Sequence, residues 1–187
     1  MKIRHPLLLR TFLAFLVLSV MAVLIFFGSR SALKTLYPLR YTEFVETYAE
    51  ENNLSDSFVY AVIKCESSFN ADAVSSVGAR GLMQIMPDTF DWIKGRFKDI
   101  IEYDAMFNSE DNIRYGCHLY GYLMEKYHRE SLSVAAYHAG PGNVDKWLKN
   151  KEYSEDGKSL SNIPYPSTRK YVTKVLETKK IYEKLYK

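Results

Sequence analysis

Residues 60–69, YAVIKCESSF, place a single carboxylate at the end of an apolar segment. The apolar residues before it occupy more than one helical face, which predicts a central helix over residues 56–66 with Ser55 as its N-cap. Glu66 would then lie at the carboxyl end of that helix, where burial and the helix dipole both disfavour the anion and raise the pKa of the side chain. A carboxyl group that keeps its proton near neutrality can act as a general acid.

Helical periodicity continues along most of the chain, and no alternating strand of convincing length interrupts it. The expected fold class is therefore all-α, with at most a short hairpin inside the polar segment 67–80. Ser109 is expected to cap a long helix and Ser167 to cap the last one. The other helices expected are residues 41–51, 87–94, 131–138 and 144–148, with the long helix over residues 110–127.

The amino-terminal part of the chain has the pattern of a membrane segment. Three cations, Lys2, Arg4 and Arg10, precede a run without charge, Pro or Gly. The length of the run suits a short spanning helix, and the cations should stay inside, which places the rest of the chain outside the membrane. A cleaved signal peptide is the open alternative. The expected organisation is a cytoplasmic basic segment at 1–10, a transmembrane signal-anchor at 11–28, a linker at 29–40 and a catalytic domain at 41–187.

The net charge of +3 comes from 25 Lys and Arg against 22 Asp and Glu. Six of the basic residues and none of the acids lie in residues 1–40, so the remainder carries 19 cations against 22 anions. A folded part without a basic excess argues against nucleic acid as its main partner.

Two cysteines, Cys65 and Cys117, lie in the part expected outside the membrane. They could form a disulfide in an oxidising exterior or be small buried side chains, and both readings stay open. Neither their number nor their spacing indicates a metal site, so no metal and no cofactor is expected.

Three further segments carry polar groups beside tight turns. Gly78 and Gly81 allow close turns before the sequence LMQ, in which Gln84 offers an acceptor and two donors that suit an acetamido group. Residues 136–140, AYHAG, place Tyr137 next to a glycine turn. Residues 164–172, PYPSTRKYV, include Tyr171 in the last helix. Each segment alone is also compatible with an ordinary turn or helix end.

Taken in order with Glu66-Ser67, these segments resemble the soluble lytic transglycosylase family, which has a goose-type lysozyme-like catalytic domain. The resemblance covers about residues 41–182. It implies non-hydrolytic cleavage of the β-1,4 bond between N-acetylmuramic acid and N-acetylglucosamine in peptidoglycan, leaving a 1,6-anhydromuramic end. The implied partners are peptidoglycan glycan strands, together with the membrane through the amino-terminal helix.

The resemblance also implies roles for individual residues. Glu66 would be the single acid/base, because the substrate's own acetamido group is thought to stabilise the intermediate. Tyr137 and Tyr171 would lie near Glu66. The residues implied to bind the sugar are Ser75, Gln84 and the backbone of Met86, together with those two tyrosines.

Two positions depart from the family pattern. The family usually has Asn where this chain has His138, and Glu where this chain has Ser167. Histidine can donate and accept hydrogen bonds in place of the amide, whereas Ser167 removes a charge from the edge of the cleft. Two alternatives therefore stay open: a muramidase of the same fold that uses water, and an inactive module that binds peptidoglycan.

Overall fold

The computed structural model describes residues 6–186 and divides into two compact units, Met1–Pro38 and Leu39–Lys187. The first unit is a single helix, α1, over Pro6–Leu36. Its segment Thr11–Leu36 has a mean hydropathy of 2.6, so it is long and apolar enough to cross a membrane, although a signal sequence would share both properties. Residues 1–5 of the expected basic segment lie outside the described residues.

The helix α1 continues through residues 29–36, which the sequence assigned to a linker. The helical state of residues 29–36 has a local reason, and their role as a linker stays a prediction. Ala, Leu, Arg and Lys dominate the segment SRSALKTL, and all four favour a helix. The helix ends at Leu36 because Tyr37 precedes Pro38, and a residue before proline avoids the helical conformation. The irregular connection to the second unit is therefore short.

The second unit is helical, and 69% of the structure is helix, with no sheet among the described residues. The expected all-α, lysozyme-like fold class is confirmed. Two isolated bridges, Val74 to Arg80 and Arg80 to Ile85, stand where a short hairpin was expected. The helices are α2 (Thr42–Glu51), α3 (Asp56–Glu66), α4 (Pro87–Phe97), the 3-10 helix η1 (Tyr103–Phe107), α5 (Ser109–Tyr127), α6 (Glu130–Ala139), α7 (Pro141–Lys149) and α8 (Pro166–Tyr186).

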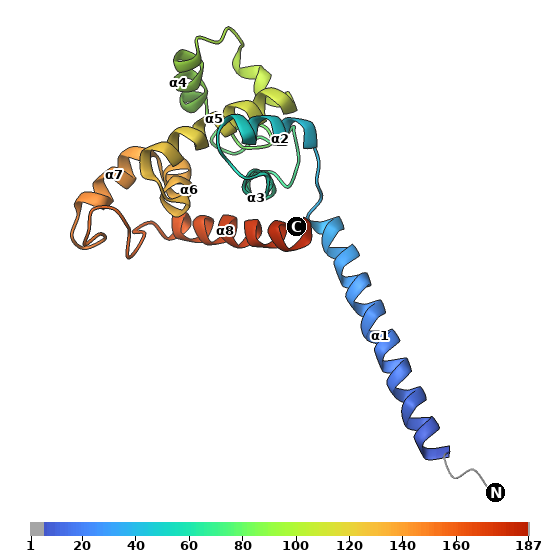
Figure 1. Cartoon of the computed structure of the whole chain (residues 1–187). Helices are drawn as coiled ribbons and strands as arrows, with labels where there is room; N and C mark the ends of the chain where they lie inside the picture. The colour runs from blue at the N-terminus through green and yellow to red at the C-terminus, as the bar shows by residue number, and fades with distance from the viewer. Residues whose placement is uncertain (1–5, 187) are drawn as a thin grey trace, which may run out of the picture. The chain divides into compact units, whose positions relative to one another are not determined.

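Helix α3 is the centre of this unit (Figure 1). Six consecutive residues, from Phe58 to Ile63, are buried, and α3 packs against α8 on one side and α2 on another. Its first turn is closed by Ser55, whose hydroxyl accepts a hydrogen bond from the Phe58 N–H at 3.3 Å. The long helix α8 also contacts α6, and its Tyr171 reaches Glu66 at the carboxyl end of α3.

Several boundaries differ from those expected. Asn108, rather than Ser109, caps α5, because its side-chain oxygen accepts from the N–H groups of Glu110 and Asp111. Ser167 lies inside the first turn of α8 rather than before it, since Pro166 occupies the first helical position that proline favours. The 3-10 helix η1 was not expected at all.

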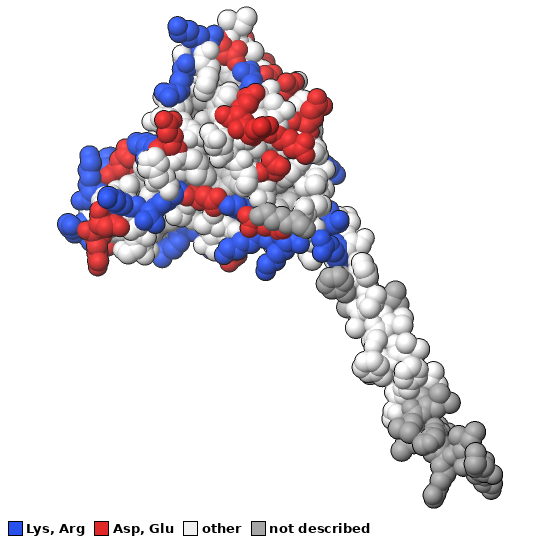
Figure 2. Space-filling view, in the orientation of Figure 1, with Lys and Arg blue, Asp and Glu red and all other residues white. Residues whose placement is uncertain are grey.

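The charges of the second unit are unevenly distributed on the face drawn in Figure 2. Asp and Glu side chains gather over α2, which carries four glutamates and no cation. Lys and Arg side chains line the exposed face of α8. The face drawn in Figure 2 therefore has an acidic region and a basic region.

Candidate active site

Glu66 is the last residue of α3, and its side chain is partly buried. Burial is the largest influence on the carboxyl group and raises its pKa to about 7. The Tyr171 hydroxyl, which donates a hydrogen bond to Oε1, and the charge of Lys174 act in the opposite direction. The group thus keeps its proton over much of the neutral range and can also lose it, as an acid that later acts as a base must do.

Three tyrosines from three helices connect Glu66 to the rest of the site. The hydroxyls of Tyr171 in α8 and Tyr120 in α5 lie 3.4 Å apart. The Tyr120 ring stacks on Tyr137 of α6, with ring centroids 4.2 Å apart and planes within 5°. Burial holds the pKa of all three tyrosines well above the usual value, so they stay protonated and remain hydrogen-bond donors.

The Tyr137 hydroxyl donates a 2.6 Å hydrogen bond to the carbonyl of Met83, in the turn that precedes α4. The structure therefore brings Glu66, Tyr137 and Tyr171 together, as the resemblance implied. Tyr120 was not among the residues expected at the site. We call Tyr171, Tyr120 and Tyr137 the tyrosine chain. Tyr120 joins it through contacts with α8 and α6, which the sequence pattern of α5 alone does not predict.

Ser75 and Gln84 use their polar atoms inside the segment between α3 and α4. The Ser75 oxygen accepts from the N–H groups of Ala79 at 2.9 Å and Val77 at 3.3 Å, and so closes a turn. The Gln84 amide nitrogen donates to the carbonyls of Gly81 at 2.9 Å and Ala73 at 3.2 Å. Gln84 can therefore meet a sugar only through its carbonyl oxygen, which accepts but does not donate.

Met86 is the N-cap residue of α4, and 36% of its surface is exposed. Its extended backbone, with φ −77° and ψ 153°, ends the turn that carries Gln84. The expected contact of the Met86 backbone with a sugar, like those of Ser75 and Gln84, stays a prediction.

Asn112, which the sequence reading missed, organises the turn that holds Met83. The side chain is completely buried in α5. Its oxygen accepts from the Met83 N–H at 2.7 Å, and its nitrogen donates to the carbonyls of Arg80 at 2.9 Å and Met106 at 2.8 Å. An amide beside Ile113 at the buried face of the long helix was the available signal. Because three backbone groups depend on this one amide, the position of the turn depends on α5.

Gly81 is required where Asn112 approaches the turn. It has φ +76°, and a Cβ atom there would lie 2.1 Å from the Met106 carbonyl oxygen and 2.2 Å from the Asn112 amide nitrogen. The glycine expected from the sequence is thus explained by both conformation and space.

The two departures from the family pattern lie near each other. His138 Nδ1 is 3.0 Å from the Thr168 hydroxyl, and the histidine ring centroid is 4.7 Å from that of Tyr171. Burial lowers the pKa of His138, so the ring is neutral at neutral pH. Ser167, beside Thr168, is exposed in the first turn of α8. The two side chains that act on the Glu66 carboxyl group are the phenol of Tyr171 and the amine of Lys174, so neither of them supplies a second carboxylate.

Cys65 and Cys117 are free thiols in the structure. Cys65 Sγ lies 3.6 Å from the Thr178 hydroxyl of α8, and Cys117 is fully buried in α5. Within residues 6–186, no group of three His, Cys, Asp or Glu side chains is placed to hold a metal ion.

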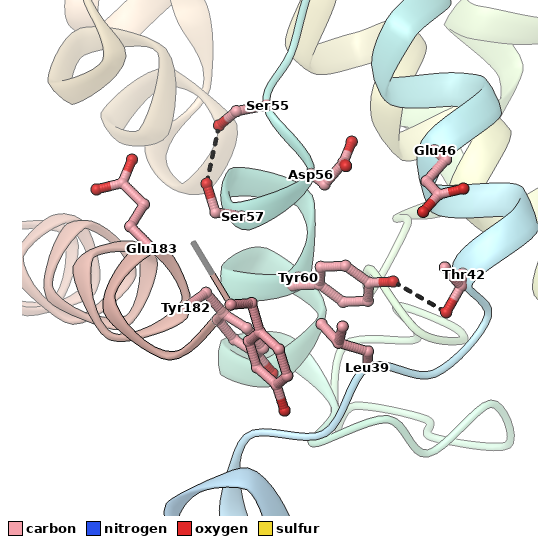
Figure 3. A pocket seen from close by; sticks show the side chains of 10 residues that line it. Leu39, Thr42, Glu46, Ser55, Asp56, Ser57, Tyr60, Tyr182 and Glu183 are labelled. Atoms are coloured by element: carbon pink, nitrogen blue, oxygen red, sulfur yellow. Dashed lines mark hydrogen bonds between the residues drawn. The ribbon is translucent and has the colours of Figure 1, made fainter. Parts of the chain in front are cut away.

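A separate cavity of about 440 Å³ lies away from Glu66, between α2, α3 and α8 (Figure 3). Its floor is formed by the stacked rings of Tyr60 and Tyr182, whose centroids are 5.4 Å apart. The Tyr60 hydroxyl points to Thr42 and donates to it at 3.3 Å. The carboxylates at its edge are those of Glu46, Asp56 and Glu183. It shares no residue with the tyrosine chain.

Comparison with known proteins shows what the chain and its fold resemble. Residues 43–160 match the family model described as "Transglycosylase SLT domain". The soluble lytic murein transglycosylase of Escherichia coli K12 is 34% identical over 149 residues, which are 77% of this chain and 23% of that protein. The membrane-bound lytic murein transglycosylase C of Histophilus somni is 26% identical over 166 residues, 76% of this chain and 46% of that protein.

Solved structures agree with this likeness. The lytic transglycosylase Slt of Pseudomonas aeruginosa, solved as an inactive mutant, has a TM-score of 0.72 and 31% identity over 82% of this chain. The 70-kDa soluble lytic transglycosylase of Escherichia coli has a TM-score of 0.73 and 31% identity over 81% of this chain. In both cases the likeness spans 25% of the solved chain, so this chain corresponds to about a quarter of these soluble relatives.

Proposed function

The chain belongs to the transglycosylase SLT domain family, and from this premise we propose that it is a membrane-associated lytic transglycosylase of peptidoglycan with Glu66 as its single acid/base. The observation that carries the proposal is the state of Glu66. Its pKa is raised to about 7 by burial, and Tyr171 donates a hydrogen bond to its carboxyl group. A group with this pKa can serve first as the acid and then as the base near neutral pH.

The proposed reaction needs two proton transfers at one residue. Protonated Glu66 donates its proton to the glycosidic oxygen between N-acetylmuramic acid and N-acetylglucosamine as the bond from that oxygen to C1 breaks. The Glu66 carboxylate then accepts the proton of the muramic C6 hydroxyl as the C6 oxygen bonds to C1. Glu66 is thereby protonated again, and the strand ends in a 1,6-anhydro sugar. Between the two transfers the Tyr171 hydroxyl stabilises the carboxylate.

We assign the placement of the sugar to the turn between α3 and α4. The Gln84 carbonyl oxygen accepts from an acetamido N–H, and Ser75 and the Met86 backbone bind the same sugar. Tyr137 acts on this turn through Met83, because its hydroxyl holds the Met83 carbonyl. Tyr171 acts at the carboxyl group itself.

We propose that α1 anchors the protein as a single-pass segment with the second unit outside the membrane. The support is the apolar segment Thr11–Leu36 and the cations Lys2, Arg4 and Arg10 before it. Amino-terminal sequencing of protein extracted from membranes tests this. A mature chain that begins at Ala32 in the soluble exported fraction would show a cleaved signal instead.

Mass spectrometry of the products tests the reaction. The full chain in detergent is incubated with purified sacculi, and the released fragments are analysed. Fragments that end in anhydromuramic acid support the proposal. Reducing muramic ends would instead indicate the muramidase, and binding to sacculi without products would indicate the inactive module.

A further inference from the structure

The second unit also contains a hollow of about 260 Å³ between α4, α5 and α6. Asp88, Thr89 and Trp92 of α4 form one side, and Tyr122 of α5 and Tyr137 of α6 form the others. We call it the Trp92 hollow. Its walls are mainly apolar and aromatic, with Asp88 and Thr89 as polar groups, which is the composition of a site for a small organic ligand.

Trp92 is an exposed aromatic residue that its neighbours hold in place. The side chain is 42% exposed, and its ring centroid lies 4.9 Å from that of Tyr122 at an angle of 57°. The Arg96 guanidinium lies 5.1 Å from the Tyr122 ring centroid and 5.8 Å from that of Trp92. A single exposed apolar residue needs no explanation. An aromatic ring that its neighbours hold beside a hollow, however, is already oriented to contact a ligand.

The Trp92 hollow and the tyrosines beside Glu66 share one residue, Tyr137. One side of Tyr137 lines the hollow, while its ring stacks on Tyr120 and its hydroxyl binds the Met83 carbonyl. Asp88 follows the proposed sugar-binding residue Met86 by two positions in the chain. Met86 is the N-cap of α4, the helix that carries Asp88 and Trp92, so a glycan strand bound at the Met86 backbone would lie at the amino end of that helix.

We propose that the Trp92 hollow binds one N-acetylated amino sugar of the same glycan strand, beyond the sugars that flank the cleaved bond. This inference rests on the proposed function. The apolar face of the sugar ring stacks on Trp92, and its hydroxyls bind Asp88 and Thr89. The volume is below the roughly 300–1,000 Å³ of pockets for drug-sized ligands, which fits a single ring.

The charge at the edge of the hollow favours a sugar over a peptide as the occupant. The peptides attached to muramic acid carry carboxylates, and the exposed carboxylate of Asp88 would repel them. Arg96 faces the two rings, where its guanidinium stacks. The N-acetylglucosamine ring is uncharged and carries hydroxyl groups, so it does not meet this repulsion.

The kinetic test compares strand lengths. Peptide-free glycan strands, prepared from sacculi and separated by length, are the substrates of the full chain in detergent. For long strands, Trp92→Ala should raise KM about fivefold, equal to about 1 kcal/mol of binding at 1.4 kcal/mol per tenfold, and leave kcat within twofold. The shortest strands that are cleaved should show no change. Trp92→Tyr, which keeps a ring, should recover most of the loss.

A matched control is Phe97→Ala, because Phe97 lies on the same helix, is 46% exposed and stacks on His118 outside the Trp92 hollow. It should leave KM unchanged at every length. Equal effects of Trp92→Ala on short and long strands, or a fall in kcat alone, would overturn the inference in favour of a structural role. A loss seen only with strands that carry peptides would assign the hollow to the peptide and overturn it as well.

A binding test uses the two tryptophans of the chain. Trp147 is 6% exposed and acts as a buried reference, so a ligand at the hollow should change the fluorescence of Trp92 alone. Glu66→Gln protein is titrated with peptide-free strands. The emission change should appear with long strands and vanish in Glu66→Gln with Trp92→Phe.

The two proposals fail in distinguishable ways. If strands bind by calorimetry while the emission of Trp92 stays constant, the inference is wrong but the proposed function stands. If wild-type protein neither binds nor cleaves strands, the proposed function fails and the inference fails with it.

Discussion

Two regions of different construction meet at Glu66. On one side, α3 and α8 present Glu66 and Tyr171 from regular helices that pack against each other. On the other side, the segment 67–86 has almost no regular structure and contains five residues with positive φ, three of them not glycine. Apolar packing positions the proton donor, whereas turns and one buried amide position the residues proposed to hold the sugar. The four predictions below test this division, beginning with the largest expected effect.

Glu66, on the helical side, should be essential for catalysis but contribute little to the free energy of unfolding. Glu66→Gln keeps the shape of the side chain and removes the titrating group. We expect activity on sacculi to fall at least about 10²-fold, the lower range for a positioned acid/base, and the fold to persist. Product release measured by chromatography, with circular dichroism as the folding control, checks this. Turnover near that of the wild type would remove Glu66 from the mechanism.

The irregular side should depend on Asn112 for stability. Asn112→Ala leaves the Met83 N–H and the carbonyls of Arg80 and Met106 without their buried partner. Each such group costs about 1–3 kcal/mol, so we expect the free energy of unfolding to drop by about 3–5 kcal/mol. Denaturant unfolding at pH 7 provides the measurement.

The control for this prediction is Asn108→Ala, which removes the same residue type at the exposed cap of the same helix. It should cost about 1 kcal/mol. Equal losses in the two variants would mean that the turn does not depend on its buried amide.

Two glycines in the segment 67–86 allow the cost of a positive φ to be measured apart from the cost of a steric clash. Gly78 has φ +88° with open space around a Cβ atom, while Gly81 has φ +76° and no room for one. Gly78→Ala should therefore cost only the backbone strain, about 1–2 kcal/mol. Gly81→Ala should cost about 1–3 kcal/mol more, because the methyl group forces atoms apart. Thermal unfolding of both variants checks the order, and a larger loss at Gly78 would contradict it.

The smallest expected effect is a change in pH dependence. The acid must be protonated, so activity falls as pH rises through the Glu66 pKa of about 7. Tyr171 stabilises the carboxylate and lowers that pKa. Tyr171→Phe should therefore move the alkaline limb of kcat/KM to higher pH, and Lys174→Gln should move it the same way by less. An unchanged or lowered limb in Tyr171→Phe would show that the hydroxyl does not act on the carboxylate.

The two regions also differ in how far the sequence predicts them. Ser55 and the apolar run before Glu66 determine α3 locally, so its bounds and its cap are confirmed by the structure. The helical state of residues 29–36 is equally local, because helix-forming residues dominate the segment up to the residue before Pro38. A residue such as Asn112 is different, because its partners lie as far as 32 positions away in the chain.

Long-range contacts explain the remaining gaps at the site. The tyrosine chain needs α5, α6 and α8 together, and only Tyr137 and Tyr171 came with a motif. Gln84 was expected to offer both an acceptor and two donors to a sugar, but the structure uses its amide nitrogen within the turn. Sequence patterns predict which residues lie close together at the site better than they predict which of their atoms are already used in hydrogen bonds.

The unpaired thiols have a consequence for where this domain can fold. Burial raises the pKa of Cys65 and of Cys117, so both resist ionisation and react slowly with oxidants. The Cys65 sulfur is partly buried against the Thr178 hydroxyl, and Cys117 is fully buried in α5. Export would place the domain in an oxidising compartment, yet its folding requires no oxidation step. The same native state should therefore form in the reducing interior of an expression host, and adding a reductant should leave its unfolding temperature unchanged.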